Sequence, residues 1–273
     1  MRIDVVTLFP DMVTQASAYG VTGRARERGL WRLGVWNPRD YATDAYRTID
    51  DRPYGGGPGM VLMAGPLSRA LQAARDAQAV AGMLRGTTLY LSPAGTPLSH
   101  AAVMKLAAES SLTLVAGRYE GVDQRVVDRQ VDDEVSVGDF VVSGGELPAL
   151  LVIDALVRQL PGALNDADSA PQDSFADGLL DCPHYTRPEH YDGDAVPPVL
   201  VGGDHAAIRR WRLKQALGRT WQRRPDLLER RPLSADERAL LAEYQDETSD
   251  NGPAHQGPPC AARKRPIAAN VKG

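Results

Sequence analysis

Short apolar runs alternate with amphipathic stretches along the first 162 residues of the chain. Each run ends at a turn signal and predicts a buried strand: Ile3 to Leu8, Leu33 to Trp36, Thr87 to Leu91, and Leu112 to Ala116. The amphipathic stretches predict helices: Met12 to Gly20, one starting at Gly65 and Pro66, one capped by Ser99, and Leu147 to Leu160. This alternation predicts an α/β fold with a mostly parallel sheet and flanking helices.

A change in composition follows the last of these helices. Residues 1–162 form the predicted first domain, and the small, polar segment 163–172 predicts a flexible linker. Residues 173–247 predict a helical C-terminal domain, in which Asp204 caps one helix and Ser234 forms a capping box with Glu237 at another. Residues 248–273 are polar and rich in Pro, Gly and Ala, which predicts a disordered tail.

Glycines cluster in the stretch from Leu112 to Pro148, at the ends of predicted strands. A glycine lets a ligand approach the backbone closely because it has no Cβ. Ligands bind beyond the carboxyl ends of parallel strands, so we expect the loops after Leu91, Ala116 and Ser136 to converge. The stretch therefore predicts a ligand cradle, and the alternative is that the glycines only mark turns.

A second glycine run, GGGPG at Gly55 to Gly59, does not predict a nucleotide-phosphate loop. It lacks the Lys-Ser/Thr pair of a P-loop, and no strand precedes it. The polar segment from Asn37 to Arg52, which leads into this run, has no periodicity and predicts a loop.

Composition indicates an ordinary globular protein, with 43% hydrophobic and 24% charged residues. The net charge of −4 means that any nucleic-acid contact needs a local basic face. Cys182 and Cys260 form no disulfide framework, which fits a reducing compartment. With no apolar run long enough to span a bilayer, we expect a cytoplasmic protein without a membrane partner.

One such basic face is predicted in the C-terminal domain. Its cations have few acids between them and are typical of a phosphate-binding stripe, the alternative being a solvated face: Arg209, Arg210, Arg212, Lys214, Arg219, Arg223 and Arg224. Trp211 and Trp221 lie among them, either as the core face of the helix or as base-stacking residues. Cys182, His184 and His190 lack a fourth ligand, so no metal site is predicted.

Several segments together resemble the bacterial tRNA (guanine-N1)-methyltransferases of the TrmD type, in the SPOUT superfamily. The resemblance lies in GRYEGVDQRVVD and SVGDFVVSGGELPALLVIDALVRQLPG, with TLFPDM, DDRPYGGGPGM, YLSPAG, DSFADGLLDCPHYTRP and IRRWRLKQALGRTWQRRP in the same order. It spans residues 1 to about 245, and a fixed order of long motifs is far more specific than a single glycine pattern.

The resemblance implies a deep trefoil knot, which fold rules alone would not predict. It implies S-adenosylmethionine as the cofactor, Mg²⁺ at a site that the sequence does not identify, and a homodimer whose active site lies at the subunit interface. It places the glycine run near that active site. The implied cofactor contacts are Tyr90, Leu91, Ser92, Pro93, Gly117, Tyr119, Glu120, Gly121, Ser136, Val137, Gly138, Asp139, Phe140, Val141, Val142, Gly144, Gly145 and Pro148.

The implied reaction is methyl transfer to N1 of the guanosine just 3′ of the tRNA anticodon, at position 37. Guanine N1 carries a proton at neutral pH, so a base must remove it while a donor stabilises charge on O6. The resemblance assigns the base to Asp173 and the cation to Arg158. The alternatives are a helix N-cap for Asp173, before residues 175–180, and a surface pair with Asp154 for Arg158.

For the substrate tRNA, the expected contacts are Asp181, His184, Arg209, Arg210, Lys214 and Arg219. Two other functions stay open. One is a SPOUT enzyme that methylates ribosomal RNA, with the same cofactor pocket. The other is a non-catalytic RNA-binding module, which would not need the pair of Asp173 and Arg158.

Overall fold

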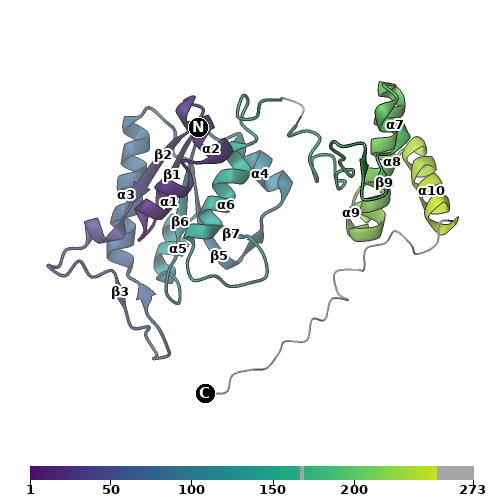
Figure 1. Ribbon diagram of the computed structural model, residues 1–273. Helices are drawn as coiled ribbons and strands as arrows, with labels where there is room; N and C mark the ends of the chain where they lie inside the picture. Colours follow the sequence, from purple (N-terminus) through teal and green to yellow (C-terminus); the bar gives the residue numbers. More distant parts are fainter. Residues whose placement is uncertain (167–168, 251–273) are drawn as a thin grey trace, which may run out of the picture. The chain divides into compact units, whose positions relative to one another are not determined.

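The computed structural model describes residues 1–166 and 169–250 of the 273-residue chain. The chain divides into two compact units, one from Met1 to Pro171 and one that starts at Gln172 (Figure 1). The boundary falls at the end of the segment that the sequence predicts as a linker. Across the described ranges, no helix is both long enough and apolar enough to cross a lipid bilayer.

The first unit is built on a five-stranded sheet whose described pairings are all parallel, in the order β2-β1-β6-β5-β7. The strands are β1 (Arg2–Val6), β2 (Arg32–Trp36), β5 (Thr87–Pro97), β6 (Ser111–Ala116) and β7 (Asp133–Ser136). This arrangement confirms the predicted α/β class and mostly parallel sheet. β5 runs past its predicted end at Leu91, and its pairing with β7 shifts register between Leu91 and Thr96.

Helices cover both faces of this sheet (Figure 1). The face with Ile3, Val5 and Leu114 packs against α1 (Pro10–Ala16), α2 (Gly20–Glu27), α4 (His100–Ala107) and α6 (Glu146–Val157). The face with Val6 and Val115 packs against α3 (Ala64–Val80) and α5 (Gln124–Gln130). Alternate residues of each strand thus enter separate cores, as the two-residue period of a strand requires.

The predicted helix from Met12 to Gly20 is wrong in its extent. α1 ends at Ala16, and Gly20 begins α2 with a φ of 63° instead of ending a helix. Gly23 lies inside α2, where a Cβ would stand 2.1 Å from the carbonyl oxygen of Ala18. Gly20 therefore allows a tight turn between two helices, and Gly23 allows a close approach of two backbone segments. In the sequence, both roles look the same as that of a glycine that ends a helix.

The predicted loop from Asn37 to Arg52 contains a 3₁₀ turn, η1 (Pro38–Tyr41), and the strand β3 (Asp50–Asp51). β3 pairs antiparallel with β4 (Val61–Leu62), so this hairpin encloses the glycine run. Other predicted caps are confirmed. The Ser99 side chain accepts from Ala102 N at the start of α4, and Pro148 lies in the first turn of α6.

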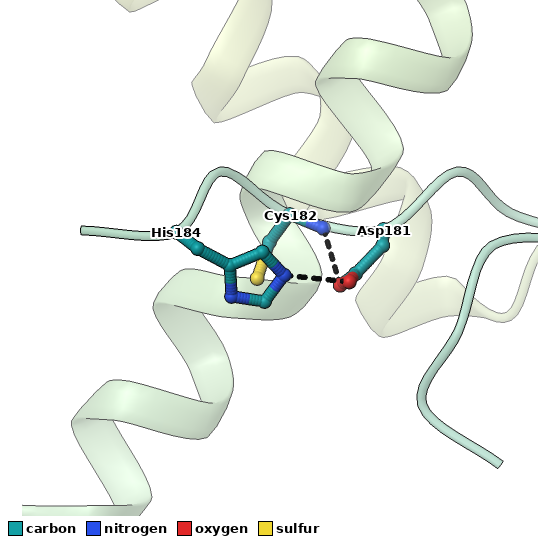
Figure 2. Close-up of side chains that lie close together, drawn as sticks. All are labelled: Asp181, Cys182 and His184. Carbon is teal, nitrogen blue, oxygen red and sulfur yellow. Dashed lines mark hydrogen bonds and ion pairs between the residues drawn. The ribbon is translucent and has the colours of Figure 1, made fainter. Parts of the chain in front are cut away.

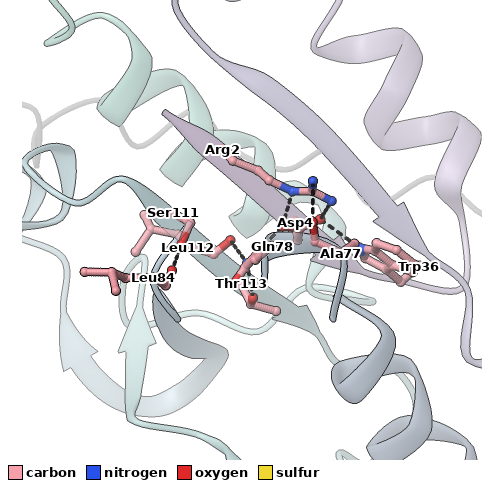
Figure 3. A network of polar contacts seen from close by, with 9 residues as sticks. All are labelled: Arg2, Asp4, Trp36, Ala77, Gln78, Leu84, Ser111, Leu112 and Thr113. Atoms are coloured by element: carbon pink, nitrogen blue, oxygen red, sulfur yellow. Dashed lines mark hydrogen bonds and ion pairs between the residues drawn. The ribbon is translucent and has the colours of Figure 1, made fainter. Parts of the chain in front are cut away.

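A buried carboxylate lies on β1, the second strand in the sheet order (Figure 3). Asp4 has no exposed surface, and its oxygens accept from Arg2 Nε at 2.8 Å, Trp36 Nε1 at 2.8 Å and Gln78 Nε2 at 2.9 Å. The Asp4 carboxylate also raises the pKa of Arg2 above its ordinary value. A buried charge is tolerated only when paired and hydrogen-bonded, so this network ties β1 to β2 and α3.

The second unit contains the hairpin β8 (His190–Tyr191) and β9 (Asp194–Ala195), then α7 (Pro198–Val201), α8 (His205–Arg223), α9 (Pro225–Glu229) and α10 (Ala235–Asp250). Its small core joins Leu179, Leu217 and Leu240. The caps predicted for this unit are confirmed. Asp204 accepts from Ala206 N and Ala207 N.

The capping box at α10 is reciprocal. Ser234 N donates to Glu237 Oε2 at 2.8 Å, and Glu237 N donates to Ser234 Oγ at 3.1 Å. α10 continues through Asp250, so residues 248–250 belong to this helix and not to the predicted tail. The rest of that segment, 251–273, lies outside the described residues.

Candidate cofactor cleft and substrate-side cluster

A cleft of about 210 Å³ lies beyond the carboxyl ends of three neighbouring strands, β5, β6 and β7. The three loops that were expected to converge, after Leu91, Ala116 and Ser136, all line it. Its wall is completed by the segment that leads into α6, up to Pro148. This is the position at which parallel α/β sheets bind small ligands.

Glycines bring the backbone segments of this cleft into contact. A Cβ on Gly145 would stand 2.6 Å from the Cα of Ala116, and Gly145 N donates to Gly117 O at 2.8 Å. A Cβ on Gly117 would stand 2.9 Å from the ring of Tyr90. The segments that form this wall are thus packed too closely to admit a side chain at either glycine.

The turn after β6 holds an unusual backbone conformation. Tyr119 has a φ of 60°, a left-handed conformation that costs a residue with a Cβ about 1–2 kcal/mol. Its neighbours tie the turn to the hairpin that encloses the glycine run. Glu120 N donates to Met60 O at 2.9 Å, and Leu62 N donates to Gly121 O at 3.0 Å. Strain of this kind persists where the surrounding structure holds it, often at binding sites.

An ion pair stabilises the wall of the cleft. Arg118 Nε donates to Glu146 Oε2 at 2.8 Å, and Thr7 Oγ1 donates to Glu146 Oε1 at 2.8 Å. Arg118 also donates to the carbonyl of Ser143 at 3.2 Å, and its guanidinium lies 4.4 Å from the ring centroid of Phe9. The loop after β6 and the loop before α6 are therefore joined by one side chain.

Burial changes the acidity of the aromatic side chains of this cleft. It raises the pKa of Tyr90, and the charge of Glu134 raises it further. Burial and the nearby Asp50 carboxylate likewise raise the pKa of Tyr119. Both phenols are neutral at physiological pH, so they act as hydrogen-bonding and stacking groups and not as anions.

The structure brings together nearly all of the residues expected to contact a cofactor. Asp139 is exposed and does not line the cleft, whereas the others do: Tyr90, Leu91, Ser92, Pro93, Gly117, Tyr119, Glu120, Gly121, Ser136, Val137, Gly138, Phe140, Val141, Val142, Gly144, Gly145 and Pro148. Arg118, Val135 and Ser143 also line it and were not predicted. Arg118 lies inside the GRYEG segment, but its partner Glu146 is 28 positions away and left no local signal.

The residues assigned to catalysis lie in different units. Arg158 is the C-cap of α6 in the first unit, partly buried. Asp173 lies in the second unit, in a series of turns where its carbonyl accepts from Ala176 N at 3.2 Å. No helix forms over residues 175–180, so the alternative role of Asp173 as a helix N-cap is wrong.

Asp181, Cys182 and His184 form a cluster in the second unit (Figure 2). Asp181 Oδ2 lies 2.7 Å from His184 Nε2, and Asp181 Oδ1 accepts from Cys182 N at 2.7 Å. Burial raises the pKa of the Cys182 thiol, and the charge of Asp181 raises it further. Because a metal binds the thiolate, the raised pKa weakens Cys182 as a metal ligand, and the carboxylate of Asp181 orients the exposed imidazole.

The basic stripe of α8 is only partly available for phosphate. Arg210 pairs with Glu243 at 2.5 Å and Lys214 pairs with Glu247 at 2.6 Å, both acids being on α10. Arg219 donates to the carbonyl of Asp181 at 3.1 Å. Arg209 remains exposed and has no hydrogen bond or ion pair with any described residue.

The fold and cleft define an α/β protein with a small-molecule-sized cleft at the carboxyl edge of a parallel sheet. Comparison with known proteins identifies the family of this chain within that class. The family model described as tRNA (Guanine-1)-methyltransferase TrmD matches residues 1–230. The chain therefore belongs to the tRNA (guanine-1)-methyltransferase family.

Individual relatives agree with this assignment. The tRNA (guanine-N(1)-)-methyltransferase of Aromatoleum aromaticum is 62% identical over 246 residues, covering 90% of this chain and 94% of that protein. The protein of the same name from Chromobacterium violaceum is 59% identical, covering 90% and 97%. That from Pseudomonas savastanoi is 57% identical, covering 92% and 99%.

Proposed function

We propose that the protein transfers the methyl group of S-adenosylmethionine to N1 of guanosine 37 in tRNA, in the cytoplasm. Its family makes it a tRNA (guanine-N1)-methyltransferase. The cofactor, the position in the tRNA and the roles of individual residues are the proposal. One observation carries it: in a chain of this family, the motif residues of three separate loops line a single cleft.

S-adenosylmethionine fits the chemistry of this cleft. Main-chain groups of the loops after β5, β6 and β7 would bind the adenine edge, and Tyr90 and Pro148 offer apolar contact. Glu120, an exposed carboxylate at the cleft, would face the ribose hydroxyls or the positive sulfur. When bound, the cofactor supplies an electrophilic methyl group on that sulfur.

For the chemical step, Asp173 would accept the N1 proton, and the Arg158 guanidinium would stabilise the charge that develops on O6. Arg158 ends a helix whose other end forms part of the cleft wall, so its position is fixed relative to the cofactor site. Asp173 belongs to the unit with the exposed basic face of α8, which would bind the tRNA backbone. Asp181 and His184 would contact the tRNA near the target base.

A homodimer would place the two units of different chains on one substrate. Exposed apolar side chains on adjoining helices support it, because Leu147 and Leu151 project from α6 at 49% and 55% exposure and Met12 from α1. Apolar patches of this kind mark protein–protein contacts. A trefoil knot would fit the way the segment before α6 packs on Gly117 after β6.

Mg²⁺ does not fit the one cluster of potential ligands found among the described residues. That cluster offers a thiol and an imidazole beside a single carboxylate, whereas Mg²⁺ requires oxygen ligands in octahedral geometry. We therefore derive no step through a metal ion.

The test is transfer of labelled methyl from S-adenosylmethionine to tRNA transcripts that differ only at position 37. A transcript with G37 should be methylated, and one with A37 should not. A ribosomal RNA fragment with unpaired guanosines serves as a third substrate. Transfer to ribosomal RNA but not to tRNA would favour the ribosomal enzyme, and absence of transfer to any substrate would favour a binding module.

A further inference from the structure

A second cavity, here called the Tyr185 pocket, lies wholly within the second unit and takes no part in the site described above beyond sharing His184. Its volume is about 890 Å³, within the range of small-molecule sites. It lies between the segment 183–189, α7 and α8. It is lined by Pro183, His184, Tyr185, Thr186, Arg187, Pro188, Glu189, Val196, Leu200, Val201, Ile208, Trp211 and Arg212.

The pocket combines aromatic rings with exposed apolar surface. The rings of Tyr185 and Trp211 have centroids 6.3 Å apart and are inclined by 56°. Tyr185 is 49% exposed and Val201 is 55% exposed, although both line a concave site. A tilted aromatic pair with an accessible face can take a planar apolar group against one ring.

The two cations at the pocket differ from Arg210 and Lys214, the paired cations of α8. Arg187 and Arg212 line it, and neither guanidinium forms a hydrogen bond or ion pair with any residue that the structure describes. On the same helix, Arg210 and Lys214 are held by acids of α10. The single acid of the lining is Glu189. The pocket thus presents aromatic surface together with two arginines against one acid, and aromatic surface with net positive charge is the combination that binds unpaired nucleotides.

We propose that the Tyr185 pocket binds an unpaired base of the tRNA other than the target guanine, with the adjoining phosphate on Arg187 and Arg212. This inference rests on the proposed function for its choice of RNA. The base assigned to this pocket is not the target, because neither Asp173 nor Arg158, the residues proposed to act on the target guanine, lines the pocket. The pocket would hold the tRNA in register while the target base enters the active site.

The experiment places 2-aminopurine, one position at a time, in the single-stranded anticodon loop of a tRNA transcript and measures its fluorescence with the full-length protein. We expect quenching at one position other than 37. Tyr185→Ala should abolish that quenching and weaken tRNA binding about tenfold, the usual order for loss of one base–aromatic stack. Tyr185→Phe should keep both the quenching and the wild-type affinity for tRNA, since it retains the aromatic ring.

Tyr191→Ala is the matched control, because Tyr191 is an exposed tyrosine of the neighbouring hairpin and does not line the pocket. It should leave quenching and tRNA affinity unchanged. Cofactor binding by calorimetry should be equal in all three variants, and the KM for tRNA should rise in Tyr185→Ala with kcat retained.

Quenching at position 37 itself, or equal loss of affinity in Tyr185→Ala and Tyr191→Ala, would overturn the proposal. So would wild-type binding by Tyr185→Ala, which would leave the pocket to a protein partner. The binding readouts do not depend on methyl transfer. Stacking without methylation would refute the proposed function alone, and methylation without Tyr185-dependent stacking would refute the pocket alone.

Discussion

Arg118 and Glu146 form an ion pair, 2.8 Å from Nε to Oε2, that joins the loop after β6 to the start of α6 at the candidate cofactor cleft. Glu146 has no exposed surface, and its second oxygen accepts from Thr7. It also lies in the first turn of α6, where the helix dipole favours a negative charge. The buried carboxylate is thus stabilised by Arg118, by Thr7 and by the helix dipole. It in turn orients the Arg118 side chain, which donates to the carbonyl of Ser143 in the loop before α6.

The substitution Glu146→Gln tests the role of this pair. The amide keeps the size of the side chain but removes the charge that orients the guanidinium. We expect the Kd for S-adenosylmethionine to rise about tenfold, which corresponds to about 1.4 kcal/mol. The free energy of unfolding should fall by about 1–3 kcal/mol. Calorimetry and urea denaturation measure the two effects, with exposed Glu27→Gln as the control.

Asp173→Ala tests the proposed general base. Without the carboxylate, the N1 proton has no acceptor, so kcat should fall by about 10²- to 10⁴-fold. Cofactor affinity should stay at the wild-type value, because Asp173 lies outside the cleft. Asp177→Ala, in the same series of turns, is the control and should keep its turnover. A wild-type rate in Asp173→Ala would remove this residue from the mechanism.

Gly145→Ala tests the close packing of the cleft backbone. The added Cβ would meet the Cα of Ala116 at 2.6 Å, and main chain cannot yield as a flexible side chain does. We expect a loss of about 1–3 kcal/mol in unfolding free energy and a large loss of cofactor affinity. Gly65→Ala is the matched control, since its Cβ would find only Arg69 at 3.5 Å within a helix. The free energy of unfolding of Gly65→Ala should equal or exceed the wild-type value.

Asp4→Ala tests the buried network of the sheet. It would leave the donors of Arg2, Trp36 and Gln78 without their shared acceptor. Breaking a buried, hydrogen-bonded charge pair costs about 3–5 kcal/mol, so the urea midpoint should fall sharply. The exposed Asp51→Ala should change it little. A wild-type midpoint for Asp4→Ala would show that the network contributes no net stability.

The pair of Asp181 and His184 predicts a pH dependence. Burial opposes ionisation of Asp181, but hydrogen bonds from His184 and from Cys182 N outweigh it and lower the pKa of this carboxyl below its ordinary value. The resulting stabilisation is present above the unfolded pKa and is lost as pH falls through the folded one, below about pH 4. His184→Ala should move the Asp181 pKa upward, which carboxyl-carbon NMR titration would show.

Local signals explain which parts of this molecule the sequence could predict. The strands β1, β2 and β6 follow from short apolar runs, and the caps at Ser99, Asp204 and Ser234 from residues a few positions apart. The convergence of three loops followed from one rule about parallel sheets. These features depend on neighbours in the chain or on the fold class alone.

The remainder depends on partners distant in sequence. Arg118 and Glu146, Asp4 and Gln78, and Arg210 and Glu243 are each separated by many residues, and no periodicity marks them as pairs. The basic stripe of α8 illustrates this effect. In the sequence, Arg210 and Lys214 look free to bind phosphate, but in the structure they form ion pairs with acids of α10. Gly20 likewise reads as a helix stop, although its positive φ begins α2.

The position of β1 in the sheet has a consequence for synthesis of the chain. β1 pairs on one side with β2, but its partner on the other side is β6, so that Arg2 lies beside Ser111. During translation the first strand emerges early, and the N–H and C=O groups of its edge that pairs with β6 stay unpaired until β6 has left the ribosome. Such an edge pairs readily with other chains. Nascent chains stalled between β2 and β6 would therefore be prone to aggregate, and would be natural clients for a chaperone.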